Sequence, residues 1–147
     1  MKSGITQWRA KEVFQKVTDA NLKAMNTAVM VVERDVKTHF TLQGAGNASP
    51  RGDKMHYASL PGQPPAIDTG VLRSSIKGVV EKKALGIIGK VGPDIDYIAA
   101  RADVGTDVEY GYYLEIGTSK IEPRPYLRPA LKRTRRQVEK IFKEANK

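Results

Sequence analysis

The chain has 147 residues, 40% of them hydrophobic, and this length fits a single domain (1–147) better than two. The absence of cysteine excludes disulfide bonds, thiolate zinc sites and a cysteine nucleophile. The net charge of +9 favours a polyanion or an acidic protein surface as partner. Residues 120–147 hold ten basic and three acidic side chains, an excess of +7.

Nothing in the sequence indicates a membrane protein. No apolar run approaches the roughly 18 residues that span a bilayer. The first ten residues lack the apolar stretch of a signal peptide. We therefore expect a protein made and used in a cytoplasm, or in something assembled there, with no membrane partner.

Residues 6–40 carry the periodicity of one long amphipathic helix, without an interrupting proline or glycine. At 1.5 Å per residue the helix would be roughly 50 Å long, more than a domain of this size needs to cover its own sheet. Either it lies on the sheet with a frayed end, or its apolar stripe meets another subunit near Trp8 or Phe40. The stripe consists of Phe14, Val17, Asn21, Met25, Ala28, Val32, Val36 and Phe40.

Residues 41–66 are rich in glycine, proline, serine and asparagine and predict a long flexible loop. Loops beyond about 12–15 residues are usually functional or disordered. The tripeptide Arg-Gly-Asp at 51–53 is too short to indicate adhesion, and we interpret it as solvated loop.

Three segments with alternating polarity, 75–82, 86–93 and 96–105, predict an antiparallel meander with one buried face. The long helix is the natural cover for that face. Before the meander, Asp68 or Thr69 is suited to cap a short helical turn whose Leu72 points inward.

Two further helices follow. Residues 106–117 predict a short helix with Asp107 as N-cap, a shared face of Val108, Tyr112 and Ile116, and Gly117 at the left-handed end. Residues 127–146 predict a second amphipathic helix, from Leu127 to Ala145. The fold class is therefore α+β. A long N-terminal and a C-terminal helix pack on a small antiparallel sheet of three to four strands, with one short helix before the C-terminal arm.

A stiff, proline-rich arm spans residues 117–128. Arg124 and Arg128 each precede a proline, which disfavours helical backbone angles, and Pro125 and Pro129 lie where the last helix begins. Such stiffness lowers the entropy lost on docking. Two alternatives stay open: the arm packs on its own domain and sets the helix angle, or it docks between subunits.

In the second alternative Tyr126 is the anchor, and the Glu115 carboxylate pairs with the guanidinium of Arg124 or Arg128. The candidate docking residues are Glu115, Gly117, Thr118, Arg124, Pro125, Tyr126, Arg128 and Pro129.

Two blocks of the sequence resemble small neck proteins of long-tailed bacteriophages, variously described as head–tail joining, tail-completion or minor tail proteins. The blocks are "PPAIDTGVLRSSI" (64–76) and "YYLEIGTSKIEPRPYLRPAL" (112–131), which match the family in order and spacing. Tyr126 stands where the family often has phenylalanine. The blocks cover about a third of the chain, and the layout of long helix, loop and arm covers nearly all of it.

The resemblance implies a structural virion protein rather than an enzyme. It implies a homo-oligomeric ring, usually of six subunits, at the head-proximal end of the tail. The implied partners are the head connector or adaptor, the tail tube or tail terminator proteins, and double-stranded DNA passing through the lumen. The implied location is the virion neck, with assembly in the host cytoplasm.

Catalysis is not expected. His39 and His56 have no partners at ligand or triad spacing, and no phosphate-binding loop is present. "PDID" (93–96) begins like a nuclease motif, but the acid-x-Lys triplet that should follow is missing, so we interpret it as a turn. We expect no catalytic residue, no cofactor and no metal.

An alternative function is that of a small basic protein that binds double-stranded DNA by itself. Basic residues on one helix contact phosphates without reading sequence, but no stacking aromatics accompany them here. In a ring, the same residues would line a DNA channel or meet an acidic partner. The candidates are Lys132, Arg133, Arg135 and Arg136.

Overall fold

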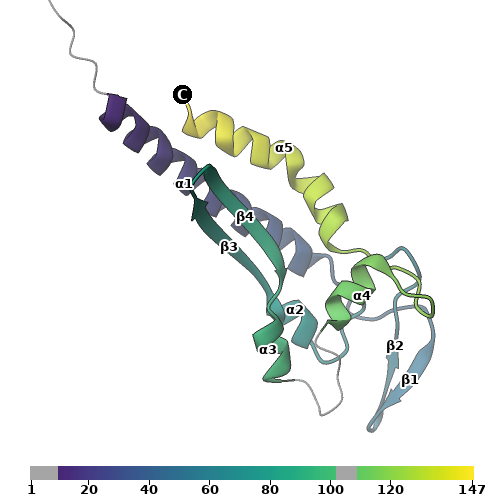
Figure 1. The fold of residues 1–147 in the computed structure, drawn as a ribbon. Helices are drawn as coiled ribbons and strands as arrows, with labels where there is room; N and C mark the ends of the chain where they lie inside the picture. The colour runs from purple at the N-terminus through teal and green to yellow at the C-terminus, as the bar shows by residue number, and fades with distance from the viewer. Residues whose placement is uncertain (1–9, 102–108) are drawn as a thin grey trace, which may run out of the picture.

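Helix α1 (Ala10–Thr38) is the axis of the fold, and the other elements lie along it or near its C-terminal end (Figure 1). The computed structural model describes residues 10–101 and 109–147. Within these ranges it has five helices and two antiparallel sheets of two strands each. The predicted α+β class, with the N- and C-terminal helices packed on a sheet, is confirmed.

The predicted apolar stripe of α1 is buried only in its second half. Its buried members are Ala28, Val32, Val36 and Phe40. Phe14 is 74% exposed, and Val17 is also exposed, because no described element covers the first turns. The helix ends at Thr38, two residues before the predicted end, and residues 6–9 lie outside the described part.

The hairpin of β3 (Ile76–Lys83) and β4 (Gly86–Pro93) lies along α1. Gly78 and Gly89 face the helix and allow the close approach. A Cβ on Gly78 would overlap Val29, and one on Gly89 would lie 2.6 Å from the Val29 Cγ2 atom. The amide of Gly78 donates a hydrogen bond of 2.8 Å to the Glu33 carboxylate, which further ties the hairpin to the helix.

The third strand predicted at 96–105 is wrong for its described part. Helix α3 (Ile95–Ala99) stands there instead. The Asp94 carboxylate caps it by accepting from the Tyr97 amide at 3.2 Å, so "PDID" begins a helix. Only Ile98 of this helix is buried, and alternation over so few residues does not separate a strand from a short alanine-containing helix. Residues 102–105 lie outside the described part.

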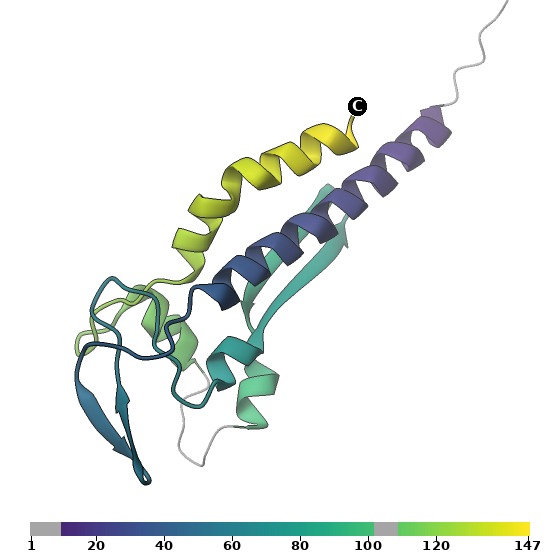
Figure 2. The ribbon, with the colours of Figure 1, turned by 180° about the vertical axis from the view of Figure 1, so that it is seen from behind.

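The predicted loop 41–66 contains a second hairpin, β1 (Ala48–Arg51) paired with β2 (Lys54–Tyr57). Its two-residue turn uses Gly52 at a φ of 59°. The hairpin lies at the end of the molecule away from the start of α1 (Figure 2). Arg51, the first residue of Arg-Gly-Asp, forms an ion pair of 2.8 Å with Asp68 and is not a free loop side chain.

The hydrophobic core lies at the C-terminal end of α1, where the short helices α2 (Val71–Ser75) and α4 (Tyr110–Ile116) meet the start of α5 (Leu127–Ala145). The N-cap of α2 is Gly70 and no side chain caps the helix, so the predicted cap at Asp68 or Thr69 is wrong, although the Val71 amide donates to the Thr69 hydroxyl at 3.4 Å. The buried cluster consists of Val32, Val36, Phe40, Leu72, Ile76, Ile98, Leu114, Tyr126 and Ala130.

Helix α5 runs back beside α1 (Figures 1 and 2). Arg133 on α5 binds the Asp35 carboxylate on α1 at 2.6 Å. At the far end, the Asn146 side-chain amide donates to the Asn21 side chain at 3.0 Å. The end of α5 therefore lies beside the first half of α1.

Candidate docking arm, pocket and basic helix face

Helix α4 begins at Tyr110, and the predicted N-cap Asp107 lies outside the described part. The residues that α4 buries are Gly111, Leu114 and Glu115. Tyr112 and Ile116, predicted to share one face with Val108, are 58% and 41% exposed, and Val108 lies outside the described part. The helix therefore packs on the core with the neighbouring face, which carries Leu114 and the Glu115 carboxylate.

Gly117 ends α4 with a φ of 78°, a value that favours glycine, but its ψ of 174° lies outside the predicted left-handed helical region. Its amide donates to the Tyr113 carbonyl at 2.8 Å. The next residues form a tight turn in which the Thr118 amide donates to the Ile121 carbonyl at 2.7 Å. A Cβ on Gly117 would lie 2.9 Å from that carbonyl oxygen. The turn therefore needs glycine for two reasons: the positive φ and the lack of room for a side chain.

The predicted pairing of Glu115 with a guanidinium is wrong. The buried Glu115 carboxylate instead accepts three main-chain hydrogen bonds, from the amides of Tyr126 (2.7 Å), Leu127 (2.9 Å) and Arg128 (3.0 Å). These amides start α5 and have no partner inside the helix. A carboxylate at a helix N-terminus also meets the favourable end of the helix dipole. Glu115 therefore joins α4 to α5.

Tyr126 is 2% exposed and packs in its own chain, with its ring centroid 5.4 Å from that of Phe40. Its hydroxyl donates to the Gly111 carbonyl at 2.9 Å. Burial raises the pKa of Tyr126 far above its usual value, and the charge of Glu115 adds to this effect. For Tyr126 the first alternative holds: the residue sets the angle of the last helix.

The rest of the arm divides into anchored and exposed residues. The Arg124 amide donates to the Leu114 carbonyl at 2.7 Å, and the Arg124 Nε donates to the Ser59 carbonyl at 3.0 Å. Pro125 and Pro129 are half-buried. The exposed side chains of the arm are those of Thr118, Ser119, Lys120, Ile121, Glu122, Pro123 and Arg128.

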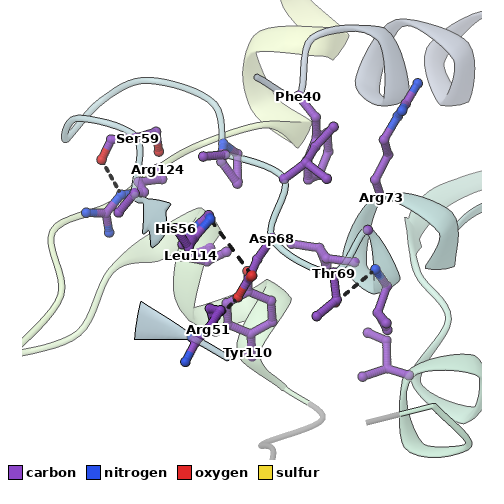
Figure 3. Close-up of a pocket in the computed structure, with 18 of the residues that line it drawn as sticks. Phe40, Arg51, His56, Ser59, Asp68, Thr69, Arg73, Tyr110, Leu114 and Arg124 are labelled. Atoms are coloured by element: carbon purple, nitrogen blue, oxygen red, sulfur yellow. Dashed lines mark hydrogen bonds and ion pairs between the residues drawn. The ribbon is translucent and has the colours of Figure 1, made fainter. Parts of the chain in front are cut away.

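A pocket of about 590 Å³ lies between the β1–β2 hairpin, α2 and α4 (Figure 3). Phe40, Leu72 and Leu114 form part of its apolar lining. Its polar side chains come from distant parts of the sequence, so no spacing signalled them in advance. They are Ser49, Arg51, His56, Ser59, Asp68, Thr69, Arg73, Arg101, Tyr110 and Arg124.

A second, more apolar groove of about 490 Å³ lies between α1, β4 and α5. Met25 and Val29 line it from α1, Gly89 from β4, and Leu131 and Val138 from α5. Leu131, predicted in the seam of α5, is 57% exposed, because α5 meets α1 only partly along this groove.

The predicted basic residues of α5 fall into two groups. Arg133 binds Asp35 on α1, and Arg135 pairs with Glu139 at 2.9 Å. Lys132 and Arg136 form no ion pair within the described residues. At 100° per residue they share an arc opposite the buried Ala130 and Thr134. We call this arc the basic stripe; it consists of Arg128, Lys132, Arg136, Lys140 and Lys143.

In residues 10–101 and 109–147 no cluster of three or more His, Asp or Glu side chains could hold a metal ion. None of the helices described there is long and apolar enough to cross a bilayer. Comparisons of the chain with protein-family models, with curated proteins and with solved structures find no match.

Proposed function

We propose that this chain is a structural subunit of a tailed-phage neck. In this proposal, copies of the chain form a ring at the head-proximal end of the tail, complete the tail and join it to the head connector around the DNA. A hexamer is the ring that the resemblance implies. The proposal assigns the chain no catalytic step.

The observation that carries the assembly role is the size of the surface. The chain exposes 11042 Å², whereas a compact monomer of 16.2 kDa exposes about 7,500 Å². If residues 1–9 and 102–108, which lie outside the described part, contributed the full area of an unfolded chain (about 1.45 Å² per dalton), they would account for roughly 2,500 Å² of this area. The remaining area of about 8,500 Å² still exceeds the roughly 6,800 Å² expected for the remaining mass.

Exposed apolar side chains support the same role. Phe14 near the start of α1, Leu85 at the tip of the β3–β4 hairpin and Ile121 in the arm are all exposed, and they lie on different elements. Isolated exposed apolar residues are normal in monomers. Their spread over a surface of this size favours contacts with several neighbours, as a subunit between head and tail requires.

The two sequence blocks that carry the family resemblance pack against each other. Leu72 and Ile76 from the first block share the core cluster with Leu114 and Tyr126 from the second. The matched residues are therefore the ones that fold the junction between α4 and α5. This supports a shared fold as the reason for the resemblance, and it leaves the exposed residues of the arm to contact neighbours.

The experiment that tests the proposal is electron microscopy of particles made without this protein. Full heads beside finished but unattached tails are the expected result, and normal particles would overturn it. Because Tyr126 is buried, the arm is better tested by changing the exposed Ile121 and Arg128, as Ile121→Ser with Arg128→Ala. This variant should keep the wild-type unfolding temperature and lose tail joining.

The basic stripe favours a second candidate, an accessory protein that binds double-stranded DNA as a monomer. The stripe extends over about 22 Å of helix, from Arg128 to Lys143, and its arc contains one acidic residue, Glu139. Salt-dependent binding distinguishes the two functions. A free DNA binder loses affinity steeply as salt rises, whereas a neck subunit binds DNA only weakly until it is assembled.

A further inference from the structure

The pocket between the β1–β2 hairpin and α4 contains more hydrogen-bond donors than acceptors. Arg51 and Arg124 lie on either side of His56 and Asp68, and Tyr110 lies beside Asp68 (Figure 3). Asp68 is the only carboxylate among the lining residues, and Arg51 already pairs with it at 2.8 Å. With histidine neutral, the four arginines that line the pocket outnumber its one carboxylate, and Arg124 is the one beside this cluster that forms no ion pair within the described residues.

The guanidinium of Arg124 is bound through Nε alone, which leaves its two terminal nitrogens free to donate. Its Nε is fixed by the Ser59 carbonyl at 3.0 Å, and its terminal nitrogens have no hydrogen-bond partner among the described residues. A guanidinium anchored through Nε still presents two parallel N–H donors, the arrangement that binds a carboxylate with two hydrogen bonds. Arg73, in contrast, turns away from the cluster and binds the Lys37 carbonyl at 3.0 Å (Figure 3).

Ser59 provides a second, independent observation. It lines the same pocket and is 1% exposed, yet its Oγ has no hydrogen-bond partner. It is the one buried side-chain nitrogen or oxygen in the described residues of which this is true. A buried hydroxyl without a partner is destabilising, so such a group in a pocket calls for an acceptor from outside the chain.

The charge and the lining favour a monoanion over a phosphate group. Asp68 repels a second negative charge. Arg73 and Arg101 also line the pocket, but the Arg73 guanidinium binds the Lys37 carbonyl and that of Arg101 lies 3.9 Å from the centre of the Tyr97 ring. Burial and the nearby Asp68 raise the pKa of Tyr110, which keeps its hydroxyl protonated as a donor. Phe40, Leu72 and Leu114 can receive an apolar group attached to the anion.

We propose that this pocket binds a carboxylate carried on an apolar stem, with Arg124 and the Ser59 hydroxyl as its donors. The carboxylate accepts two hydrogen bonds from the terminal nitrogens of Arg124 and one from Ser59 Oγ. The stem lies on the apolar lining. The carboxylate belongs either to an acidic residue of a peptide segment or to a small organic acid, and the chemistry of the site is the same for both.

The test is titration of the isotope-labelled full chain with three probes, followed by NMR at the Ser59 amide and the Arg124 Nε. The probes are butyrate, inorganic phosphate and the blocked peptide acetyl-Ile-Glu-Pro-amide, which reproduces the exposed Ile121–Pro123. We expect saturable shifts with butyrate and the peptide, and weaker binding of phosphate. Tighter binding of the peptide identifies a polypeptide ligand, and tighter binding of butyrate identifies a small acid.

Ser59→Ala is the decisive variant because it removes a hydroxyl that has no partner in the folded chain. It should fold at least as stably as the wild type and bind butyrate about tenfold more weakly. Lys54→Gln removes an exposed charge outside the pocket and should leave binding unchanged. Three results would each overturn the proposal: unchanged affinity in Ser59→Ala, preference for phosphate, or no saturable shift at concentrations on the order of 100 mM.

Discussion

The Glu115 carboxylate and the main-chain amide of Tyr126 are joined by a hydrogen bond of 2.7 Å, although the two residues are eleven positions apart in the sequence. Two more amides at the start of α5 bind the same carboxylate. One buried side chain therefore closes the arm into a loop and fixes where the last helix begins. Its role is structural and does not need a second subunit.

Glu115→Gln should lower the free energy of unfolding by about 1–3 kcal/mol, because charge-assisted hydrogen bonds to three amides are replaced by weaker ones. Urea unfolding followed by circular dichroism measures the change. Glu122→Gln is the matched control, since Glu122 is exposed on the same arm. A loss in the control as large as in Glu115→Gln would contradict the assignment.

Tyr126→Phe should cost about 0.5–1.5 kcal/mol, because it removes the hydrogen bond to the Gly111 carbonyl and keeps the ring against Phe40. Truncation to alanine should cost about 3–5 kcal/mol, as expected for a buried aromatic side chain. Thermal or urea unfolding compares the two variants. Equal losses would show that the ring contributes little to the core.

Alkaline pH should destabilise the fold through tyrosine ionisation. The pKa of Tyr126 is raised in the folded chain, while an unfolded tyrosine has a pKa of about 10. The folded state therefore binds this proton more tightly, and the associated stability is present below pH 10 and falls as the pH rises above it. Tyr126→Phe should flatten this fall, and the part due to Tyr110, whose pKa is also raised, should remain.

Gly89→Ala should destabilise the packing of the β3–β4 hairpin on α1 by about 1–3 kcal/mol, because the new Cβ meets Val29 and Met25. Combining it with Val29→Ala should recover part of the loss, which a double-mutant cycle detects as a coupling. Gly92→Ala is the control, since nothing lies within 4 Å of its added Cβ. Strictly additive losses would place the hairpin farther from the helix.

The basic stripe should respond to salt in proportion to its free charges. Lys132→Gln and Arg136→Gln should each reduce the salt slope of binding to double-stranded DNA by about one. Arg135→Gln should change it less, because Arg135 already pairs with Glu139. Binding is measured with the assembled protein on a fixed DNA fragment over a range of salt. Equal slopes for all three variants would exclude the stripe as the DNA contact.

The elements that the sequence predicts well are those with a long or well-bounded pattern. Helix α1 follows from an apolar repeat over more than twenty residues, and the β3–β4 hairpin follows from alternation around a short turn. Helix α5 begins at Leu127, the predicted residue. In each case the packing partner only reinforces a preference that the segment already has.

The sequence pattern mispredicted the segments whose structure depends on a capping side chain or on polar contacts between residues far apart in the chain. Asp94 turns 95–99 into a helix although the residues alternate. We expected the Glu115 carboxylate to pair with a nearby guanidinium, the strongest side-chain donor in that stretch of sequence. Its actual donors are main-chain amides, and a sequence does not show which amides lack a partner. The pocket could not be predicted because Arg51, Asp68 and Arg124 are far apart in the sequence and come to line one pocket only when the chain folds.

The one-sided position of the core has a consequence for how the molecule opens. The buried cluster gathers at the C-terminal end of α1, whereas the first turns of that helix carry Phe14 in solvent. Amide protons should therefore exchange fastest at the start of α1 and slowest around Val36, because local unfolding begins at the N-terminal end of this helix. A neighbour that covers the start of α1 would slow this fraying without touching the core, which lets assembly rigidify a chain that is already folded.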